Sequence, residues 1–287
     1  MKRTTIIASL FLAIGLCAGI VGCSKENPAA PVTVNTAQPE ESAALVQPEA
    51  IAMKPPAEKF GWTAHDKTTF ICAKQWGLSD YRANYMSGAS HMPDVYDYEG
   101  TVPGTQQWRH GYVLAYGAYI WGVAHWCCDD NIRGGDYALN GKSAYYYYSI
   151  GNKDWGDWYL GYASHYLEDV GNPWHTSANI VQQLDTHGPY ETWVENNWTS
   201  GHNLSTAVSS DYYYYAITFI YGSVANLAKW SNGKSATVYN AYVASGKPTG
   251  AGTGNAALVS ETRLLLRETG RYVKGLIKYT LDAKSAW

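Results

Sequence analysis

The sequence predicts an all-α fold, with one multi-helix domain over residues 61–287. Long segments place apolar and aromatic residues at helical spacing, and the alternating pattern typical of strands is absent from the sequence. Glycine and proline concentrate between these segments, most clearly over residues 245–254. We therefore expect a bundle of helices that presents its functional side chains from several helices into one cleft.

The first half of the domain contains three predicted helices. The first covers residues 67–76, and the second covers residues 110–127, which are apolar or aromatic nearly all round, as in a buried helix. The third covers residues 155–170 and should end at Gly171-Asn172-Pro173, because proline does not continue a helix.

The second half contains three more. One should begin near His187, with Pro189 in its first turn, where no amide hydrogen bond is lost. Another is predicted over residues 209–230, including the tyrosine run 212–215, and the last over residues 258–281. The apolar face of this last helix is formed by Leu264, Leu265, Val273, Ile277 and Leu281.

Five residues of the kinds that bind metal ions lie close together in the middle of the chain. They are His165, Asp169, His175, His187 and Glu191. Successive members are four, six, twelve and four residues apart, so the first and last pairs each project from one helix face. Imidazole and carboxylate are ligands that zinc accepts. The break at Asn172-Pro173 turns the chain just before His175, which favours a shared site over a chance spacing.

The string HYLEDVGNPWH, which begins at His165, resembles the signature of the bacterial zinc-dependent phospholipases C. That family shares its fold and a three-zinc site with the S1/P1-type nucleases. The positions that match its pattern are His165, Tyr166, Asp169, Pro173 and His175. Glu168 stands where Gly or Thr is usual, and Asn179 follows the second histidine by four residues rather than three. The resemblance implies this family's all-α fold.

The resemblance also implies ligands upstream. GASHMPD offers Asp94, WRH offers His110, and GWTAH resembles the family's N-terminal tryptophan with its partner histidine, here Trp62 and His65. The implied zinc ions are held by Asp94, His110, His165 and Asp169; by Trp62, His65 and Asp169; and by His175, His187 and Glu191. The competing histidines, His91 and His125, are expected to be structural or to support ligands.

This ligand set suits attack of water on a phosphodiester. Closely spaced zinc ions offset the negative charge and lower the pKa of a shared water, which gives a zinc-bound hydroxide at neutral pH. Asp94 is the residue expected to orient or deprotonate that water. Because the histidines must be neutral and the carboxylates ionised, metal binding should fail at low pH.

The N-terminal stretch is typical of export. Residues 1–23 read as a lipoprotein-type signal peptide, with a lipobox-like ending, IVGC, that makes Cys23 the lipid-bearing residue. Residues 24–60 read as a disordered linker or pro-segment. Trp62 can offer an α-amino group only if the chain is cut after Gly61, which would remove the lipid. We therefore expect a lipid-anchored protein or one secreted after removal of the pro-segment.

The cysteines, the net charge and the aromatic residues bear on disulfide pairing, on binding partners and on packing. Cys72 could be bridged to Cys127 or Cys128, or all three could be core thiols. The net charge is −3 and no basic stripe is present, so no stable nucleic-acid partner is expected. The chain has 12 Trp and 25 Tyr, which suit packing between helices and membrane interfaces.

The leading interpretation is a monomeric zinc-dependent phospholipase C that cleaves the glycerol–phosphate bond of phospholipids at a membrane surface. The alternative on the same scaffold is an S1/P1-type single-strand nuclease or 3′-nucleotidase, which the short Trp62-to-His65 gap favours. A third hypothesis is a zinc-stabilised surface lipoprotein without catalysis. The preferred head group stays open.

Overall fold

The computed structural model describes residues 64–93, 143–177, 180–218 and 220–287. The chain divides into two units, residues 1–51 and 52–287, and all described residues belong to the second. They form helices joined by turns and extended segments, without strands, so the predicted all-α class is confirmed for this part of the chain. The predicted signal peptide, linker and domain boundary lie outside the described residues and stay predictions.

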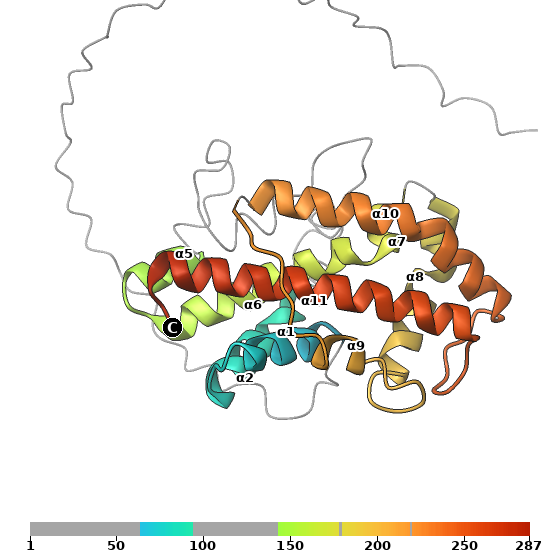
Figure 1. Ribbon diagram of the computed structural model, residues 1–287, viewed down its shortest axis with the longest axis horizontal. Helices are drawn as coiled ribbons and strands as arrows, with labels where there is room; N and C mark the ends of the chain where they lie inside the picture. Colours follow the sequence, from blue (N-terminus) through green and yellow to red (C-terminus); the bar gives the residue numbers. More distant parts are fainter. Residues whose placement is uncertain (1–63, 94–142, 178–179, 219) are drawn as a thin grey trace, which may run out of the picture. The chain divides into compact units, whose positions relative to one another are not determined.

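The helices are labelled as in Figure 1. They are α1 Ala64–Gln75, α2 Asp80–Ser90, α5 Ala144–Ser149, α6 Lys153–Gly171, α7 Pro173–Thr176, α8 Ile180–Asn196, α9 Thr206–Ser209, α10 Ile220–Ala244 and α11 Ala256–Lys284. The two longest, α10 and α11, pack against each other and lie side by side in Figure 1. None of the described helices is long and apolar enough to cross a membrane.

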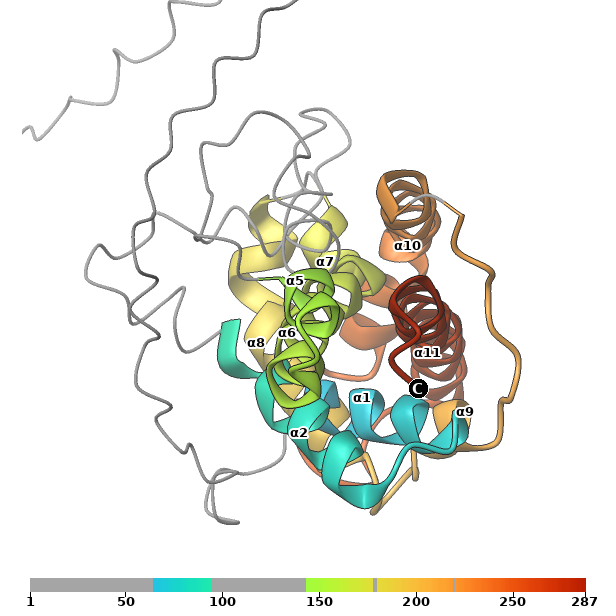
Figure 2. The ribbon, with the colours of Figure 1, turned by 90° about the vertical axis from the view of Figure 1, so that its left-hand side faces the viewer.

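Helix α6 lies at the centre of the packing, between α2 on one side and α10 and α11 on the other (Figure 2). Every residue from Gly156 to Gly171 is buried. Two glycines allow neighbours to come close, because a Cβ at Gly161 would lie 2.0 Å from the carbonyl oxygen of Met86, and one at Gly171 would lie 2.0 Å from Oγ1 of Thr269. A helix buried on all sides can hold polar side chains only where they have partners.

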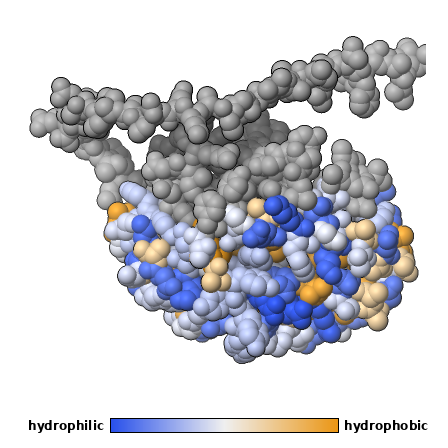
Figure 3. Space-filling model, turned by 45° about the horizontal axis from the view of Figure 1, so that its top comes forward, coloured by the Kyte–Doolittle hydropathy of each residue, from blue (hydrophilic) through white to orange (hydrophobic). Residues whose placement is uncertain are grey.

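The outer surface of the described residues is more hydrophilic than this core. On the face shown in Figure 3, hydrophilic residues predominate and apolar residues are scattered among them. The aromatic side chains mostly pack inside, as Trp193 and Trp198 do at 0% and 2% exposure. Packing between helices is therefore the main use of the aromatic residues among those described.

The predicted break after α6 is confirmed. α6 ends at Gly171, and Asn172 accepts a hydrogen bond from the backbone N–H of Trp174 at 3.2 Å, which caps the start of α7. Pro173 is the first residue of α7, where its missing N–H costs no hydrogen bond. The chain therefore changes direction between Asp169 and His175.

The helix predicted over residues 209–230 is wrong in its first part. The tyrosine run is extended, α10 begins only at Ile220, and Tyr212 and Tyr213 are 74% and 75% exposed. Polar partners on α11 explain the difference, because the backbone N–H of Tyr215 donates to the carbonyl of Arg271 at 3.2 Å. Gly275 makes room, since a Cβ there would lie 2.1 Å from the Tyr215 carbonyl oxygen.

The predicted position of Pro189 in a first turn is also wrong. α8 already begins at Ile180, so Pro189 lies inside the helix. An interior proline costs about 3 kcal/mol, and contacts with Trp174 on both sides offset this. Trp174 donates from Nε1 to Thr186 at 2.7 Å and stacks on Tyr190 with ring centroids 4.0 Å apart.

The other predicted helices in the described part of the chain are confirmed as α1, α6 and α11, each a few residues longer than expected. The helix predicted over residues 110–127 lies outside the described residues. Cys72 is a buried free thiol that packs in the hydrophobic core, with its Sγ 3.5 Å from the carbonyl oxygen of Gly270.

Candidate metal centre

Three side chains from α1 and α6 form what we call the first group: His65, His165 and Asp169. One ligand atom from each lies within 4.8 Å of the others. His165 and Asp169 are one turn apart on α6 and are 0% and 2% exposed. The two oxygens of Asp169 serve different histidines, because Oδ2 lies 3.3 Å from Nε2 of His165 and Oδ1 lies 3.7 Å from Nε2 of His65.

Three side chains from α7 and α8 form the second group: His175, His187 and Glu191. Nε2 of His187 lies 2.7 Å from Oε1 of Glu191 and 3.0 Å from Nε2 of His175. Nε2 of His175 lies 3.3 Å from the same Glu191 oxygen. The break after α6 places His175 against α8, and the i,i+4 spacing on α8 brings His187 and Glu191 to one face.

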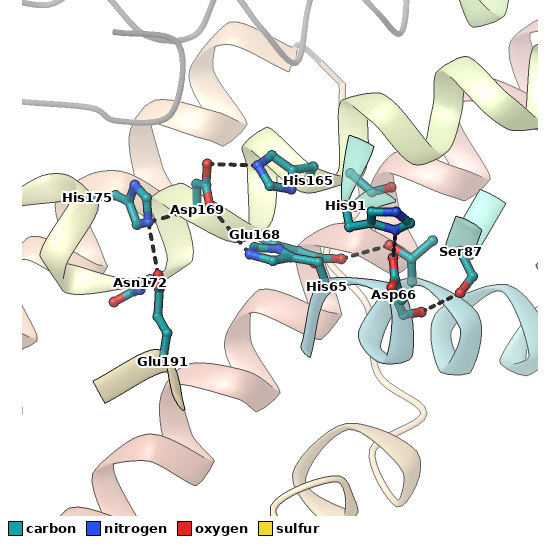
Figure 4. A network of polar contacts seen from close by, with 12 residues as sticks. His65, Asp66, Ser87, His91, His165, Glu168, Asp169, Asn172, His175 and Glu191 are labelled. Atoms are coloured by element: carbon teal, nitrogen blue, oxygen red, sulfur yellow. Dashed lines mark hydrogen bonds and ion pairs between the residues drawn. The ribbon is translucent and has the colours of Figure 1, made fainter. Parts of the chain in front are cut away.

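The two groups are neighbours. Nε2 of His175 lies 3.5 Å from Oδ1 of Asp169 (Figure 4), so Asp169 contacts residues of both groups. The five residues that sequence spacing singled out are thus brought into one region by α6, α7 and α8. Each group offers the imidazole and carboxylate atoms that could hold a metal ion.

Two further side chains hold ligands in place. Glu168 binds Nδ1 of His65 through Oε2 at 2.8 Å, and Asn172 donates from Nδ2 to Oε1 of Glu191 at 3.0 Å. Sequence reasoning noted Glu168 only as a departure from a family pattern and Asn172 only as a helix breaker. The available signal was the run of apolar and aromatic residues around Glu168 on α6, which predicts a buried helix in which an acidic residue needs a partner.

The charges of the groups shift two pKa values in opposite directions. Burial and the nearby His165 lower the pKa of His65, but Glu168 and Asp169 outweigh them and raise it from 6.5 to about 9. Burial raises the pKa of Glu191, but hydrogen bonds from His175 and His187 outweigh burial and hold it well below its usual range. The Glu191 side chain is still 40% exposed, so water screens part of this effect.

Burial is also the main cause of a shift at Glu168. It raises the pKa of this carboxyl, and the hydrogen bonds from His65 and Thr69 offset burial only in part. The raised pKa of His65 still favours a protonated imidazole between the two carboxyl groups in the metal-free protein.

The remaining predicted site residues are not all described. Trp62, Asp94 and His110, and the competing His125, lie outside the described residues, so their predicted roles stay predictions. His91 is described and belongs to neither group; its Nδ1 lies 2.9 Å from Oδ1 of Asp66.

A cavity of about 120 Å³ lies beside both groups. Its polar wall includes His65, Glu168, Asn172 and Glu191, and its apolar wall includes Val194 and Leu265. Lys and Arg are absent from its described lining. A small ligand could therefore reach both groups from a partly apolar space without meeting a permanent cation of the described chain.

No protein-family model matches the sequence, and no curated protein matches it. Among solved structures, the chain is similar to the crystal structure of the alpha-toxin of Clostridium perfringens from an avian strain. The sequence identity is 14% and the TM-score is 0.44. The match covers 79% of this chain and 65% of the toxin chain, so this chain spans slightly less than two thirds of that protein's length.

Proposed function

We propose that this chain is a zinc-dependent phosphodiesterase, and more narrowly a phospholipase C that hydrolyses the glycerol–phosphate bond of phospholipids. The observation that supports this most directly is the pairing of two three-residue ligand groups through the contact between Asp169 and His175. Adjacent metal groups are the arrangement used for hydrolysis of phosphate esters.

The ligand atoms of the second group fit zinc. In a tetrahedral site with N and O ligands at about 2.0–2.1 Å, neighbouring ligand atoms are about 3.3 Å apart. Of the three separations among His175, His187 and Glu191, the longest equals that value at 3.3 Å, and the other two are shorter at 3.0 and 2.7 Å. The first group offers the same donor types, and we propose that Asp94, His110 and Trp62 complete the centre to three ions.

Zinc bound to these groups would offset the charge of a phosphodiester and activate water at neutral pH. The protein's own residues position the ligands and shield them from water. Asp169 presents its oxygens to histidines of both groups, Glu168 and Asn172 hold His65 and Glu191, and the helices around α6 keep bulk water from the buried ligands. We propose that Asp94 orients or deprotonates the attacking water.

Lipid is favoured over nucleic acid as the substrate. The HYLED string resembles the phospholipases, and the cavity beside the groups combines an apolar wall with carboxylates rather than basic residues. Nucleic-acid binding relies on clustered Lys and Arg. The nuclease alternative is supported by the short spacing between Trp62 and His65.

We further propose that the protein is exported as a monomer. It is either anchored through Cys23 or released by a cut before Trp62, which would complete the centre. Intact mass of the protein recovered from its producing cells tests the cut: an active, zinc-loaded form that still begins near Cys23 would contradict it.

The test of function uses the full chain as its host processes it, with zinc added or removed by a chelator. Phospholipid micelles, single-stranded DNA and RNA are offered side by side, with a His187→Ala variant as the matched control. Zinc-dependent release of phosphorylated head group supports the phospholipase C. Release of nucleotides with lipid intact would support the nuclease, and zinc binding without turnover would support the non-catalytic alternative.

A further inference from the structure

We infer that Glu168 is a positioning residue, which holds the imidazole of His65 in the orientation that ligation of a metal ion requires. The inference rests on the metal centre proposed above and assigns a task to the residue at which the HYLED string departs from the family pattern.

The imidazole of His65 lies between two carboxylates that are neighbours in sequence on α6 (Figure 4). Glu168 Oε2 lies 2.8 Å from Nδ1, and Asp169 Oδ1 lies 3.7 Å from Nε2. When Nδ1 donates its hydrogen to Glu168, the neutral ring has its lone pair at Nε2, on the side of Asp169. A histidine that ligates a metal usually has its other nitrogen bound to a carboxylate or carbonyl in this way.

Glu168 is itself held rigidly. Oγ1 of Thr69 donates to Oε1 of Glu168 at 2.8 Å. Thr69 follows His65 by one turn on α1, so the two side chains face the same way and bind the two oxygens of one carboxylate. With Glu168 only 6% exposed, water does not compete for these bonds.

A purely structural role fits these contacts less well. A buried carboxylate kept for stability is normally paired with Lys or Arg, because its desolvation is costly. The hydrogen-bond partners of Glu168 in the described part of the chain are instead a hydroxyl and an imidazole of the first group. Its position therefore suits the control of one ligand's orientation and tautomer.

The experiment measures metal binding by the full chain as its host processes it. A His187→Ala background removes one ligand of the second group, so that binding at the first group dominates. Zinc affinity is measured by competition with a chelator, and Co²⁺ absorption spectra report ligand geometry. The variants are Glu168→Ala, Glu168→Gln and Thr69→Val. Asp154→Asn is the matched control, because it removes an exposed carboxylate from the same helix roughly 20 Å away.

Glu168→Ala should weaken zinc binding by about 10- to 100-fold and change the Co²⁺ spectrum. Glu168→Gln should recover most of the affinity, because its amide oxygen still accepts from Nδ1 of His65. Thr69→Val should weaken binding in the same direction but less, and it provides the test if Glu168→Ala does not fold. Asp154→Asn should bind as the unmodified background does.

Unchanged zinc affinity and an unchanged Co²⁺ spectrum in Glu168→Ala would overturn the inference, even if its melting temperature falls. In that case the proposed function would survive, because the background and the full chain would still bind zinc. A full chain that binds no zinc at all would overturn both.

Discussion

Nε2 of His175 lies 3.5 Å from Oδ1 of Asp169, although the helix break at Asn172 and Pro173 separates the two residues. The contact joins the first and second groups. It also makes the two groups unequal among the described residues, because Asp169 contacts histidines of both groups, whereas the histidines that Glu191 contacts there belong to the second group.

The first prediction concerns this asymmetry. Asp169→Asn keeps the shape of the side chain but removes its charge, so it should lower the metal content of both groups. Turnover should fall by more than about 100-fold, because loss of a residue that only supports a metal ligand typically costs about 10- to 100-fold. Metal analysis per chain and a phosphodiester assay measure the two effects. His187→Ala is the comparison and should reduce occupancy of the second group only. Equal metal loss in both variants would contradict the special position of Asp169.

Spacing within one segment was enough to predict much of this site. The i,i+4 pairs on α6 and α8 place side chains on one face whatever the rest of the fold does, and Pro173 sets the end of α6. The local physics of a helix and its break therefore predicted the close approach of His165, Asp169 and His175.

Contacts between distant segments could not be predicted in this way. The Glu168 contact with His65 joins residues 103 positions apart, and no periodicity within α1 or α6 encodes it. The extended conformation of residues 212–215 could not be predicted either. Their aromatic content favoured a helix, whereas the backbone N–H of Tyr215 donates to the Arg271 carbonyl on α11. Tertiary hydrogen bonds decided both cases.

The second prediction concerns pH and the metal-free protein. The pKa of His65 is about 9 when folded against an ordinary 6.5, so the folded chain binds this proton more tightly than the unfolded chain does. Protonated His65 therefore stabilises the fold fully below pH 6.5, and this contribution of at most about 3 kcal/mol is lost as the pH rises through 9.

Urea unfolding of the protein in chelator measures the free energy of unfolding at about pH 6 and about pH 9.5. The lower pH lies below the unfolded and folded pKa values of His65, and the higher pH lies above both. His65→Gln lacks the titrating group, so the stability difference between the two proteins should shrink at the higher pH. A difference that stays constant across this range would show that His65 does not bind its proton more tightly in the folded state.

The third prediction concerns the crossing of α2 and α6. In Gly161→Ala, the added Cβ would lie 2.0 Å from the carbonyl oxygen of Met86, a backbone atom that cannot move alone. The variant should lose at least about 1–3 kcal/mol of stability through overpacking. Urea unfolding of the metal-free protein measures it.

Gly233→Ala is the matched control for this substitution. Gly233 lies in the interior of α10, and a Cβ there would meet nothing within 4 Å. Alanine should therefore stabilise the helix by about 0.5–1 kcal/mol, because it loses less backbone entropy than glycine. Two variants with the same change in stability would rule out close packing at Gly161 as the cause.

The fourth prediction concerns the attachment of residues 211–217 to α11. Arg271 donates from Nε to Oδ2 of Asp211 at 2.6 Å, and its carbonyl accepts from Tyr215. Hydrogen bonds between charged groups contribute about 1.5–3 kcal/mol. Arg271→Ala should therefore free this segment and raise its rate of cleavage by chymotrypsin at least about 10-fold, a factor that corresponds to about 1.4 kcal/mol.

Arg267→Ala separates this attachment from a general loss of charge on α11. The Arg267 side chain is 44% exposed, and its ion pair in the described part of the chain is with Glu268 at 3.6 Å, so it does not hold the extended segment. Its cleavage rate should match that of the unmodified chain. If both arginine variants were cleaved at the same rate, the hydrogen bond from Arg271 to Asp211 would not be what holds residues 211–217, and other contacts with α11, such as the donation from Lys274 Nζ to the Asp211 carbonyl, would have to hold them.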